Sequence, residues 1–253
     1  MSFNYELTII IATYNAKKKL IENTLDSILN LELNQNIEII ILNSKSGYDI
    51  KDIIDKYISR LNILYFYRKD NGIYDAWNYG IKHVKSKWIS FIGAGDIVDK
   101  KYFSNFINSN LNEKNIVSFN TNIIDMNKTT IRMIKGNFNK KKFIKYMSIP
   151  HVGLFHHINL FRDGNFNLNY KYASDYDFLL RKINLLKVLY INKTLVFMLN
   201  GGLTSYSFKT LIETLKIKLI HKNSNKINCY LDFVISFFKL MIRYLHDKIR
   251  YKI

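Results

Sequence analysis

The sequence predicts an α/β fold, in which helices cover both faces of an open and mostly parallel sheet. Two short apolar runs rich in β-branched residues, 7–12 and 38–42, show no strict alternation with polar residues. Such runs are typical of strands buried on both faces of a parallel sheet. Between them, residues 19–31 have apolar side chains at helical spacing, so the three segments predict one β-α-β unit.

The alternation continues for one more unit and then weakens. We expect a helix at 50–58, a strand at 63–67, a helix at 74–84 and a strand at 88–92. Further along, the pattern predicts strands at 116–119 and 130–134, a short basic helix at 140–147 and a helix at 176–183. The only proline, Pro150, indicates a turn or the start of a strand, and an apolar segment with histidines follows at 151–161.

Composition excludes several classes of protein. The 253 residues are 48% hydrophobic and 15% aromatic, which excludes a disordered chain. The single cysteine, Cys229, excludes a disulfide framework and a cysteine-based zinc site within one chain. The first residues resemble a strand rather than a signal peptide, and no run of about 18 apolar residues is long enough to span a membrane.

The chain carries a large positive charge. It has 38 lysines and arginines against 20 aspartates and glutamates, a net charge of +18. This charge predicts an acidic partner, which could be nucleic acid, anionic lipid or a phosphorylated substrate. A basic nucleic-acid-binding protein is therefore one alternative, but the sequence has no helix-turn-helix, zinc-finger or RNP signature, so we expect no nucleic acid.

A first group of polar residues, Thr13-Tyr14-Asn15, follows the first predicted strand. A turn between a strand and a helix can present backbone N–H groups and small side chains to a nucleotide at the carboxyl edge of the sheet. The alternative interpretation, that Asn15 only caps the next helix, is equally compatible with the sequence.

A second group combines acids with glycines. Asp70, Gly72, Asp75 and Asn78 lie in one polar segment, and Asp96 follows the strand at 88–92 across Gly93 and Gly95. A carboxylate at the end of a strand is a hard oxygen ligand that suits Mg²⁺ or Mn²⁺ bridging a diphosphate. The alternative is that Asp96 is an ordinary helix N-cap.

A third group, Asp175 and Asp177, opens the helix predicted at 176–183. Carboxylates two positions apart on a helix point in different directions, so both cannot face one reacting centre. Taken alone, this pair is better explained by helix capping than by catalysis.

Together the three groups resemble the family 2 glycosyltransferases of the GT-A fold, most closely the bacterial branch that builds O-antigen and capsular polysaccharide. The stretch 70–96 has the branch's pattern D-x-G-I-Y-D-A-x-N-x-G-I … G-D, and 173–181 has its pattern A-S-D-Y-D-F-x-L-R. The resemblance covers roughly residues 5 to 205 and leaves the tail uncovered.

The resemblance implies an inverting hexosyltransferase that uses a nucleotide-diphosphate sugar, with UDP-Glc, UDP-Gal or an N-acetyl derivative expected as donor. Asp175 matches the catalytic base, Asp96 matches the metal ligand for Mn²⁺ or Mg²⁺, and Asp177 falls on a position expected to be structural. The residues that match the donor-binding motifs are Thr13, Asn15, Asp70, Gly72, Asp75 and Asn78.

Two departures from the family pattern affect this interpretation. Asn43-Ser44 stand where many members have Asp-Asp, one of which contacts the base of the nucleotide. This departure weakens the prediction that the donor nucleotide carries uracil. Gly93 and Gly95 stand where the metal-binding D-x-D region has earlier acids, so we expect weaker metal binding, and a catalytically lapsed scaffold protein is a further alternative.

Three basic or titratable side chains near the motifs have open roles. Arg68 and Lys69, beside the signature, could bind the diphosphate or simply face solvent. His151 matches a position where the branch often has histidine, and a buried, hydrogen-bonded histidine is an equally good interpretation.

The tail differs from the domain at 1–208. Residues 209–253 contain ten Lys/Arg and three Asp/Glu, a net charge of +7. We predict a basic amphipathic helix on the cytoplasmic, inner face of the bacterial inner membrane, whose basic residues meet anionic lipid. The alternative is that its apolar stripe packs on the catalytic domain. The membrane interpretation fits the resemblance, which implies an acceptor sugar on a polyprenyl diphosphate. The stripe comprises Leu231, Val234, Ile235, Phe238, Ile242, Leu245 and Ile249.

Overall fold

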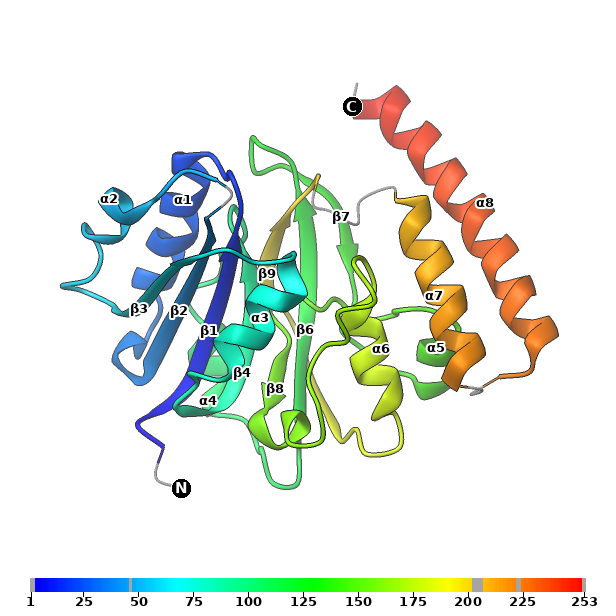
Figure 1. Cartoon of the computed structure of the whole chain (residues 1–253), viewed down its shortest axis with the longest axis horizontal. Helices are drawn as coiled ribbons and strands as arrows, with labels where there is room; N and C mark the ends of the chain where they lie inside the picture. Colours follow the sequence, from blue (N-terminus) through cyan, green and yellow to red (C-terminus); the bar gives the residue numbers. More distant parts are fainter. Residues whose placement is uncertain (1–2, 46, 202–206, 222–223, 252–253) are drawn as a thin grey trace.

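The computed structural model confirms the α/β fold. It describes residues 3–45, 47–201, 207–221 and 224–251, with side chains described as far as residue 245. One nine-stranded sheet has the order β3-β2-β1-β4-β8-β6-β9-β5, with β7 beside β6 (Figure 1). Four parallel strands form its first part: β1 (Tyr5–Thr13), β2 (Ile37–Ser44), β3 (Asn62–Arg68) and β4 (Ser86–Gly93). These are the four strands that the sequence predicts before residue 96.

The register of these strands gathers their polar ends at one edge of the sheet. Thr13 of β1 lies beside Asn43 of β2, and Ala12 lies beside Gly93 of β4. Because the strands are parallel, the turns that follow them open on the same side. The sheet therefore brings the first two predicted groups of polar residues together.

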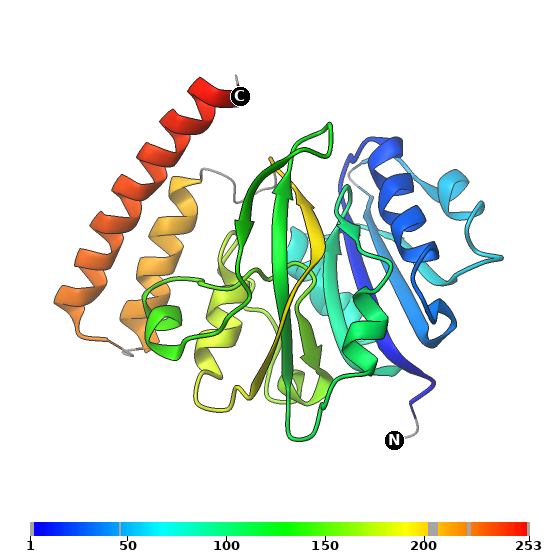
Figure 2. The same ribbon diagram turned by 180° about the vertical axis from the view of Figure 1, so that it is seen from behind.

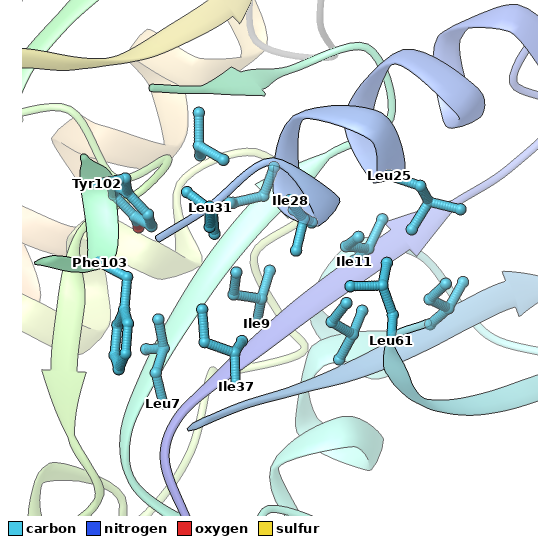
Figure 3. Packing of buried hydrophobic residues seen from close by; sticks show 14 of the residues in the cluster. Leu7, Ile9, Ile11, Leu25, Ile28, Leu31, Ile37, Leu61, Tyr102 and Phe103 are labelled. Carbon is cyan, nitrogen blue, oxygen red and sulfur yellow. The ribbon is translucent and has the colours of Figure 1, made fainter. Parts of the chain in front are cut away.

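The continuous apolar run in β1 is explained by helices on both faces of the sheet. Leu7, Ile9 and Ile11 pack with Leu25 and Ile28 of α1 (Lys18–Leu29), as Figure 3 shows. On the other face, Ile10 belongs to a second cluster with α3 (Ile73–Ile81). Side chains of one strand point alternately to the two faces, so a strand covered on both sides is apolar at every position.

The second part of the sheet is mixed rather than purely parallel. It contains β5 (Ile97–Val98), β6 (Ile116–Ile124), β7 (Thr130–Ile134), β8 (Phe155–His157) and β9 (Val188–Leu199). The short strand β8 is antiparallel to both β4 and β6 and so joins the two parts, whereas β9 runs parallel to β6. The parallel pairs still carry most of the strand pairing.

The shorter helices complete the two layers. On the face of α1 lie α2 (Lys51–Ile54) and α4 (Tyr102–Ile107); on the face of α3 lie α5 (Lys140–Lys145) and α6 (Ser174–Arg181). Two short 3₁₀ helices, η1 (Asn34–Asn36) and η2 (Ile158–Phe161), lie in the connections.

The helix predicted at 50–58 is only partly present. After α2, backbone hydrogen bonds of the α-helical and the tighter 3₁₀ type alternate. The N–H of Ile58 donates to the carbonyl of Ile54, four residues back, whereas the N–H of Lys56 donates to the carbonyl of Ile53, three residues back. Residues 50–58 keep the apolar spacing of a helix, but the hydrogen bonds that span three residues tighten the backbone into turns.

The tail forms two helices, α7 (Phe208–His221) and α8 (Lys226–Tyr251). Both views place α7 between α6 and α8, so that α8 is the outermost element (Figures 1 and 2). The predicted apolar stripe belongs to α8, except that Ile249 lies outside the described side chains. Among the helices that the structure describes, none is both long enough and apolar enough to cross a membrane.

Candidate active site

A cavity of about 480 Å³ opens at the carboxyl edge of β1 and β2. It lies where the first two predicted groups of polar residues meet, and we call it the donor cavity after the donor-binding motifs that the resemblance assigns to these residues. Three of the predicted binding residues, Thr13, Asp70 and Gly72, line it. The other lining residues are Ala12, Tyr14, Ala16, Ser44, Ile73, Ala76 and Ala94.

The polar groups of the donor cavity are held by their turns. Asp70 accepts a hydrogen bond of 3.0 Å from the N–H of Gly72, whose φ of 113° requires glycine. The buried hydroxyl of Thr13 has no hydrogen-bond partner among the described residues. Because this hydroxyl is buried, the rest of the Thr13 side chain and its backbone form the wall of the donor cavity.

The structure places the other three predicted binding residues outside the lining of this cavity. Asn15 adopts a left-handed φ of 48°, and α1 begins after Lys17 without a side-chain cap, so the interpretation of Asn15 as a helix cap is wrong. Asp75 accepts a hydrogen bond of 3.0 Å from the N–H of Asn71. Asn78 bonds both backbone groups of Phe166, at 2.8 and 3.0 Å, and so holds a distant loop.

Two further residues near the motifs have structural contacts. The guanidinium of Arg68 lies over the ring of Tyr79, 4.4 Å from its centre, while Lys69 is exposed. The side-chain amide of Asn43 donates to the carbonyl of Tyr48 at 2.9 Å, so Ser44 rather than Asn43 faces the donor cavity.

Asp96 is buried at the end of β4, with 5% of its surface exposed. Its two oxygens accept hydrogen bonds from the N–H groups of Gly93 and Leu199, at 2.8 and 2.9 Å. Burial raises the pKa of the Asp96 carboxyl to about 6. Because Asp96 precedes the short strand β5 and not a helix, the N-cap alternative is wrong.

The glycines around Asp96 make room for this carboxylate. A Cβ atom at Gly93 would lie 2.9 Å from an Asp96 oxygen, and Gly95 has a φ of +100°. Larger residues at these two positions would displace the carboxylate or strain the turn. Gly93 and Gly95, which stand where the family's metal-binding region has acids, are therefore also the residues that leave room for the Asp96 carboxylate.

Asp96 lines neither the cavity described above nor any other described pocket, and both of its oxygens already accept backbone hydrogen bonds, so a divalent cation would have to reach a buried carboxylate as its single ligand from the described chain. The described residues contain no group of three His, Cys, Asp or Glu side chains that could hold a metal ion. Each Asp96 oxygen keeps one lone pair after its backbone hydrogen bond, and carboxylate oxygen is a suitable donor for Mg²⁺ or Mn²⁺. A cation at Asp96 would take its remaining ligands from a diphosphate or from water.

Asp175 occupies the second position of α6 and lines a second cavity of about 370 Å³, which we call the tail cavity. One of its oxygens accepts hydrogen bonds from the hydroxyl of Tyr74, at 3.0 Å, and from the N–H of Tyr176, at 2.8 Å. Burial raises the pKa of the Asp175 carboxyl above its ordinary value, and these hydrogen bonds oppose the shift. The result is a fixed carboxylate facing an open space.

Asp177 points elsewhere, as expected for carboxylates two positions apart. It is 1% exposed and accepts a 3.0 Å hydrogen bond from Arg181, while Nε2 of His221 lies 2.7 Å from its other oxygen. Asp177 thus bonds a residue one turn further along α6 and a residue of α7. These contacts support the structural role that the resemblance implies for Asp177.

Tyr74 holds Asp175 and was not predicted from the sequence. Gly72 and Ile73 line the donor cavity, and the next residue, Tyr74, donates its hydroxyl to Asp175. The only signal in the sequence is the position of Tyr74 inside the signature at 70–80.

His151 is a buried residue in the wall of the tail cavity. Its ring stacks on those of Trp77 and Phe91, at centroid distances of 5.2 and 5.4 Å, and His156 lies 5.1 Å away. Burial lowers the pKa of His151 to about 3, so the ring is neutral near pH 7. The hydrogen-bonded alternative is wrong for the described residues, because neither ring nitrogen has a partner among them.

Solved structures with similar folds include those of two glycosyltransferases. Residues 1–349 of TarS from S. aureus, in complex with UDP-GlcNAc, match with a TM-score of 0.70 at 14% identity, over 90% of this chain and 70% of that one. The mannosyltransferase PcManGT from Pyrobaculum calidifontis, in complex with GDP-Man and Mn²⁺, matches with a TM-score of 0.64 at 14% identity, over 89% and 66%. These matches confirm the GT-A fold.

Relatives in sequence are also glycosyltransferases or proteins of polymer synthesis. The minor teichoic acid biosynthesis protein GgaB of Bacillus subtilis is 28% identical over 61% of this chain, and a glycosyltransferase of Rickettsia typhi is 27% identical over 75%. The chain spans only 18% and 62% of the lengths of these two relatives. The model of the family described as "Glycosyl transferase family 2" matches residues 8–168. This match covers well over half of the chain, which therefore belongs to the family 2 glycosyltransferases.

Proposed function

We propose that the protein is an inverting hexosyltransferase that moves a hexose from a nucleotide-diphosphate sugar to a lipid-diphosphate-linked acceptor sugar. The observation that carries the proposal is the hydrogen bond between Tyr74 and Asp175. It holds a carboxylate with a raised pKa against Tyr74, whose neighbour in the chain, Ile73, lines the donor cavity. A base beside a bound nucleotide sugar is what direct displacement at the anomeric carbon requires.

The donor would lie in the donor cavity with its nucleotide at the ends of β1 and β2. Tyr14 is 62% exposed there and offers a ring on which a base can stack. Ser44 lines the same cavity, and the small side chains of Ala12 and Ala94 leave room for the ribose and the phosphates. UDP-Glc, UDP-Gal and their N-acetyl derivatives are the proposed donors, in line with the UDP-GlcNAc bound by TarS.

Asp96 is the proposed ligand for Mn²⁺ or Mg²⁺. When bound, such a cation neutralises negative charge on the leaving nucleoside diphosphate. With only one carboxylate ligand from the described chain, we expect its affinity to depend on the diphosphate.

Asp175 is the proposed base. It takes the proton of the acceptor hydroxyl while that oxygen forms a bond to the anomeric carbon. The bond from this carbon to the diphosphate oxygen breaks, and the nucleoside diphosphate leaves with the electron pair. A carboxylate with a raised pKa is a stronger base, and such a group contributes roughly 10²–10⁴-fold to the rate.

The exposed face of the tail supports the proposed membrane setting and, with it, a lipid-linked acceptor. The outward face of α8 has six apolar residues that are 47% to 67% exposed, on a tail of net charge +7: Leu231, Val234, Ile235, Phe238, Ile242 and Leu245. Their exposure favours an interfacial helix on anionic lipid over a stripe packed on the catalytic domain. We place the protein on the inner face of the bacterial inner membrane, in the synthesis of O-antigen or capsule.

A donor screen tests this function. UDP-, GDP- and dTDP-sugars are offered with Mn²⁺, with and without a sugar on a prenyl diphosphate, and nucleoside diphosphate release is measured. We expect release that disappears with EDTA and in Asp96→Ala but persists in Asp99→Ala, a change of an acid three residues away. Retention on heparin without any release would favour the nucleic-acid alternative, and complete inactivity of the native protein would favour the scaffold alternative.

A further inference from the structure

The positive charge of the chain is most concentrated on β7, α5 and the segment between them. Residues 132–145 contain six lysines and arginines and no acid, whereas the tail at 209–253 spreads its net charge of +7 over a much longer stretch. All six basic residues are exposed. We call them the basic patch: Arg132, Lys135, Lys140, Lys141, Lys142 and Lys145.

Contacts within the protein do not account for this charge. In the part of the chain that the structure describes, no residue of the basic patch forms an ion pair with an acid. Lys140 donates to the side-chain oxygen of Asn184 at 2.7 Å, which is a neutral partner. Lys140 and Lys141 also open α5, where the helix dipole favours negative rather than positive charge. The lysines therefore do not stabilise α5, and their charge faces whatever lies outside the protein.

The basic patch adjoins the exposed apolar face of α8. The Nζ atoms of Lys142 on α5 and of Lys239 on α8 each lie 5.8 Å from the centre of the Tyr146 ring. Lys239 is one helical turn beyond Ile235, which is 51% exposed and belongs to the apolar face. Figure 2 shows α5, in green, on the same side of the molecule as α7 and α8. The apolar face of α8 therefore ends where the basic patch begins.

We propose that the basic patch binds the anionic headgroups of a lipid bilayer while the apolar face of α8 enters the headgroup region, an inference that rests on the membrane setting of the proposed function. Exposed lysines beside an apolar helix face are the combination that holds interfacial proteins on anionic lipid. A nucleic acid would meet the charge but leave the adjoining apolar face in water, so the pairing favours lipid. Two contacts on different elements also fix how the catalytic domain is oriented on the surface.

Vesicle binding by the full chain tests the basic patch. Lys135→Gln/Lys141→Gln/Lys142→Gln removes three of its charges. Each basic residue near an anionic surface strengthens binding about fivefold, so binding to vesicles of phosphatidylglycerol and phosphatidylcholine in equal parts should weaken about 10²-fold. Binding to vesicles of phosphatidylcholine alone should not change, because it depends on the apolar face of α8. Sedimentation at one low salt concentration measures both.

A matched variant removes the same charge elsewhere. Lys82, Lys85 and Lys87 are exposed and lie between α3 and β4 or at the start of β4. The carbonyl of Lys85 accepts a hydrogen bond of 3.1 Å from the N–H of Asn4, so these lysines lie near the N-terminus, far from α8 (Figure 1). Lys82→Gln/Lys85→Gln/Lys87→Gln should bind vesicles like the wild type.

The remaining outcomes separate this proposal from its alternatives. Unchanged vesicle binding in the patch variant, or equal weakening in both triple variants, would overturn it. Binding of DNA that the patch variant loses, without vesicle binding by the wild type, would show that the partner is nucleic acid and would also overturn it. Vesicle binding through the basic patch by a protein that releases no nucleoside diphosphate from any sugar nucleotide would refute the proposed function and leave the basic patch standing.

Discussion

The donor cavity and the tail cavity are built in different ways. The donor cavity comes from short turns after parallel strands, so that Thr13, Ser44 and Asp70 each follow directly from a strand or its turn. The tail cavity is assembled from β7, β9 and helices α5 to α8, and its carboxylate Asp175 is held by Tyr74, 101 residues away in the chain. The first cavity depends on local backbone geometry, whereas the second depends on long-range packing. We therefore expect substitutions of residues that line or support the tail cavity to affect stability and activity together.

The largest expected effect tests the division of roles between the two cavities. Asp175→Asn should lower kcat by at least about 10²-fold, because the amide cannot take the proton of the acceptor. Binding of the donor, measured by calorimetry, should change little, since Asp175 faces the tail cavity. Asp177→Asn should instead lower the free energy of unfolding, because it weakens contacts to Arg181 and His221. Full activity of Asp175→Asn would exclude Asp175 as the base.

The second prediction concerns the pH dependence of stability on the tail side. The pKa of His151 is about 3 in the folded protein and ordinarily 6.5, so on acidification the unfolded chain binds a proton that the folded protein does not. Stability is therefore lost as the pH falls below 6.5. The loss attributable to His151 between pH 6.5 and pH 4 is about 3 kcal/mol.

Urea unfolding of the wild type and of His151→Gln at both pH values measures this effect. The variant should lose less stability on acidification, while His83→Gln, a change of a histidine outside the tail cavity, should lose as much as the wild type. Identical pH dependence in wild type and His151→Gln would show that His151 is not buried as a neutral ring.

The sequence predicts the elements around the donor cavity well, because each of them has its pattern within one continuous segment. The apolar runs of β1 to β4 and the helical spacing of α1 and α3 lie in single continuous segments. The strands β8 and β9 escape prediction because β8 is only three residues long and β9 contains a polar interruption, Asn192-Lys193-Thr194. Their strand conformation comes from pairing with β4 and β6, which the sequence does not reveal.

The motifs predict the region of the site better than they predict the task of each residue. Within one signature, Asp70 and Gly72 line the donor cavity, whereas Asn78 bonds a loop 88 residues away. Spacing along α3 fixes which face each residue takes, but not whether a ligand or a protein loop covers that face. Tyr74 was missed for the same reason, since its partner Asp175 lies on another helix.

The third prediction tests how α7 supports Asp175, the proposed base. The carboxylate of Glu213 on α7 accepts hydrogen bonds from the N–H groups of Lys171, Tyr172 and Ala173, at 2.7 to 2.9 Å, directly before α6. Glu213→Gln should lower the free energy of unfolding by about 2 kcal/mol, because hydrogen bonds to a charged group are the stronger ones. It should also lower kcat, because the segment leading to Asp175 loses its support.

Glu22→Gln provides the matched control for this change. Glu22 forms an exposed ion pair with Lys56, so its loss should cost at most about 1 kcal/mol and leave kcat unchanged. Donor binding should be normal in both variants. A Glu213→Gln protein as stable and as active as Glu22→Gln would mean that α7 does not position α6.

The smallest expected effect concerns the outer face of α8, which lines no part of the donor cavity. If this face lies in the headgroup region of a membrane, each large apolar side chain that leaves water contributes about 1–2 kcal/mol. Ile242 is 67% exposed, so Ile242→Ser should weaken binding to anionic vesicles about tenfold while leaving folding intact.

Leu185→Ser is the matched control. It removes a similarly exposed side chain, 61%, from the turn after α6 and should leave vesicle binding unchanged. Sedimentation with vesicles measures both, and added salt should weaken binding of every variant because the basic residues of the tail meet anionic lipid. Equal sedimentation of the Ile242 and Leu185 variants would remove α8 as the membrane contact and leave its apolar face to another partner.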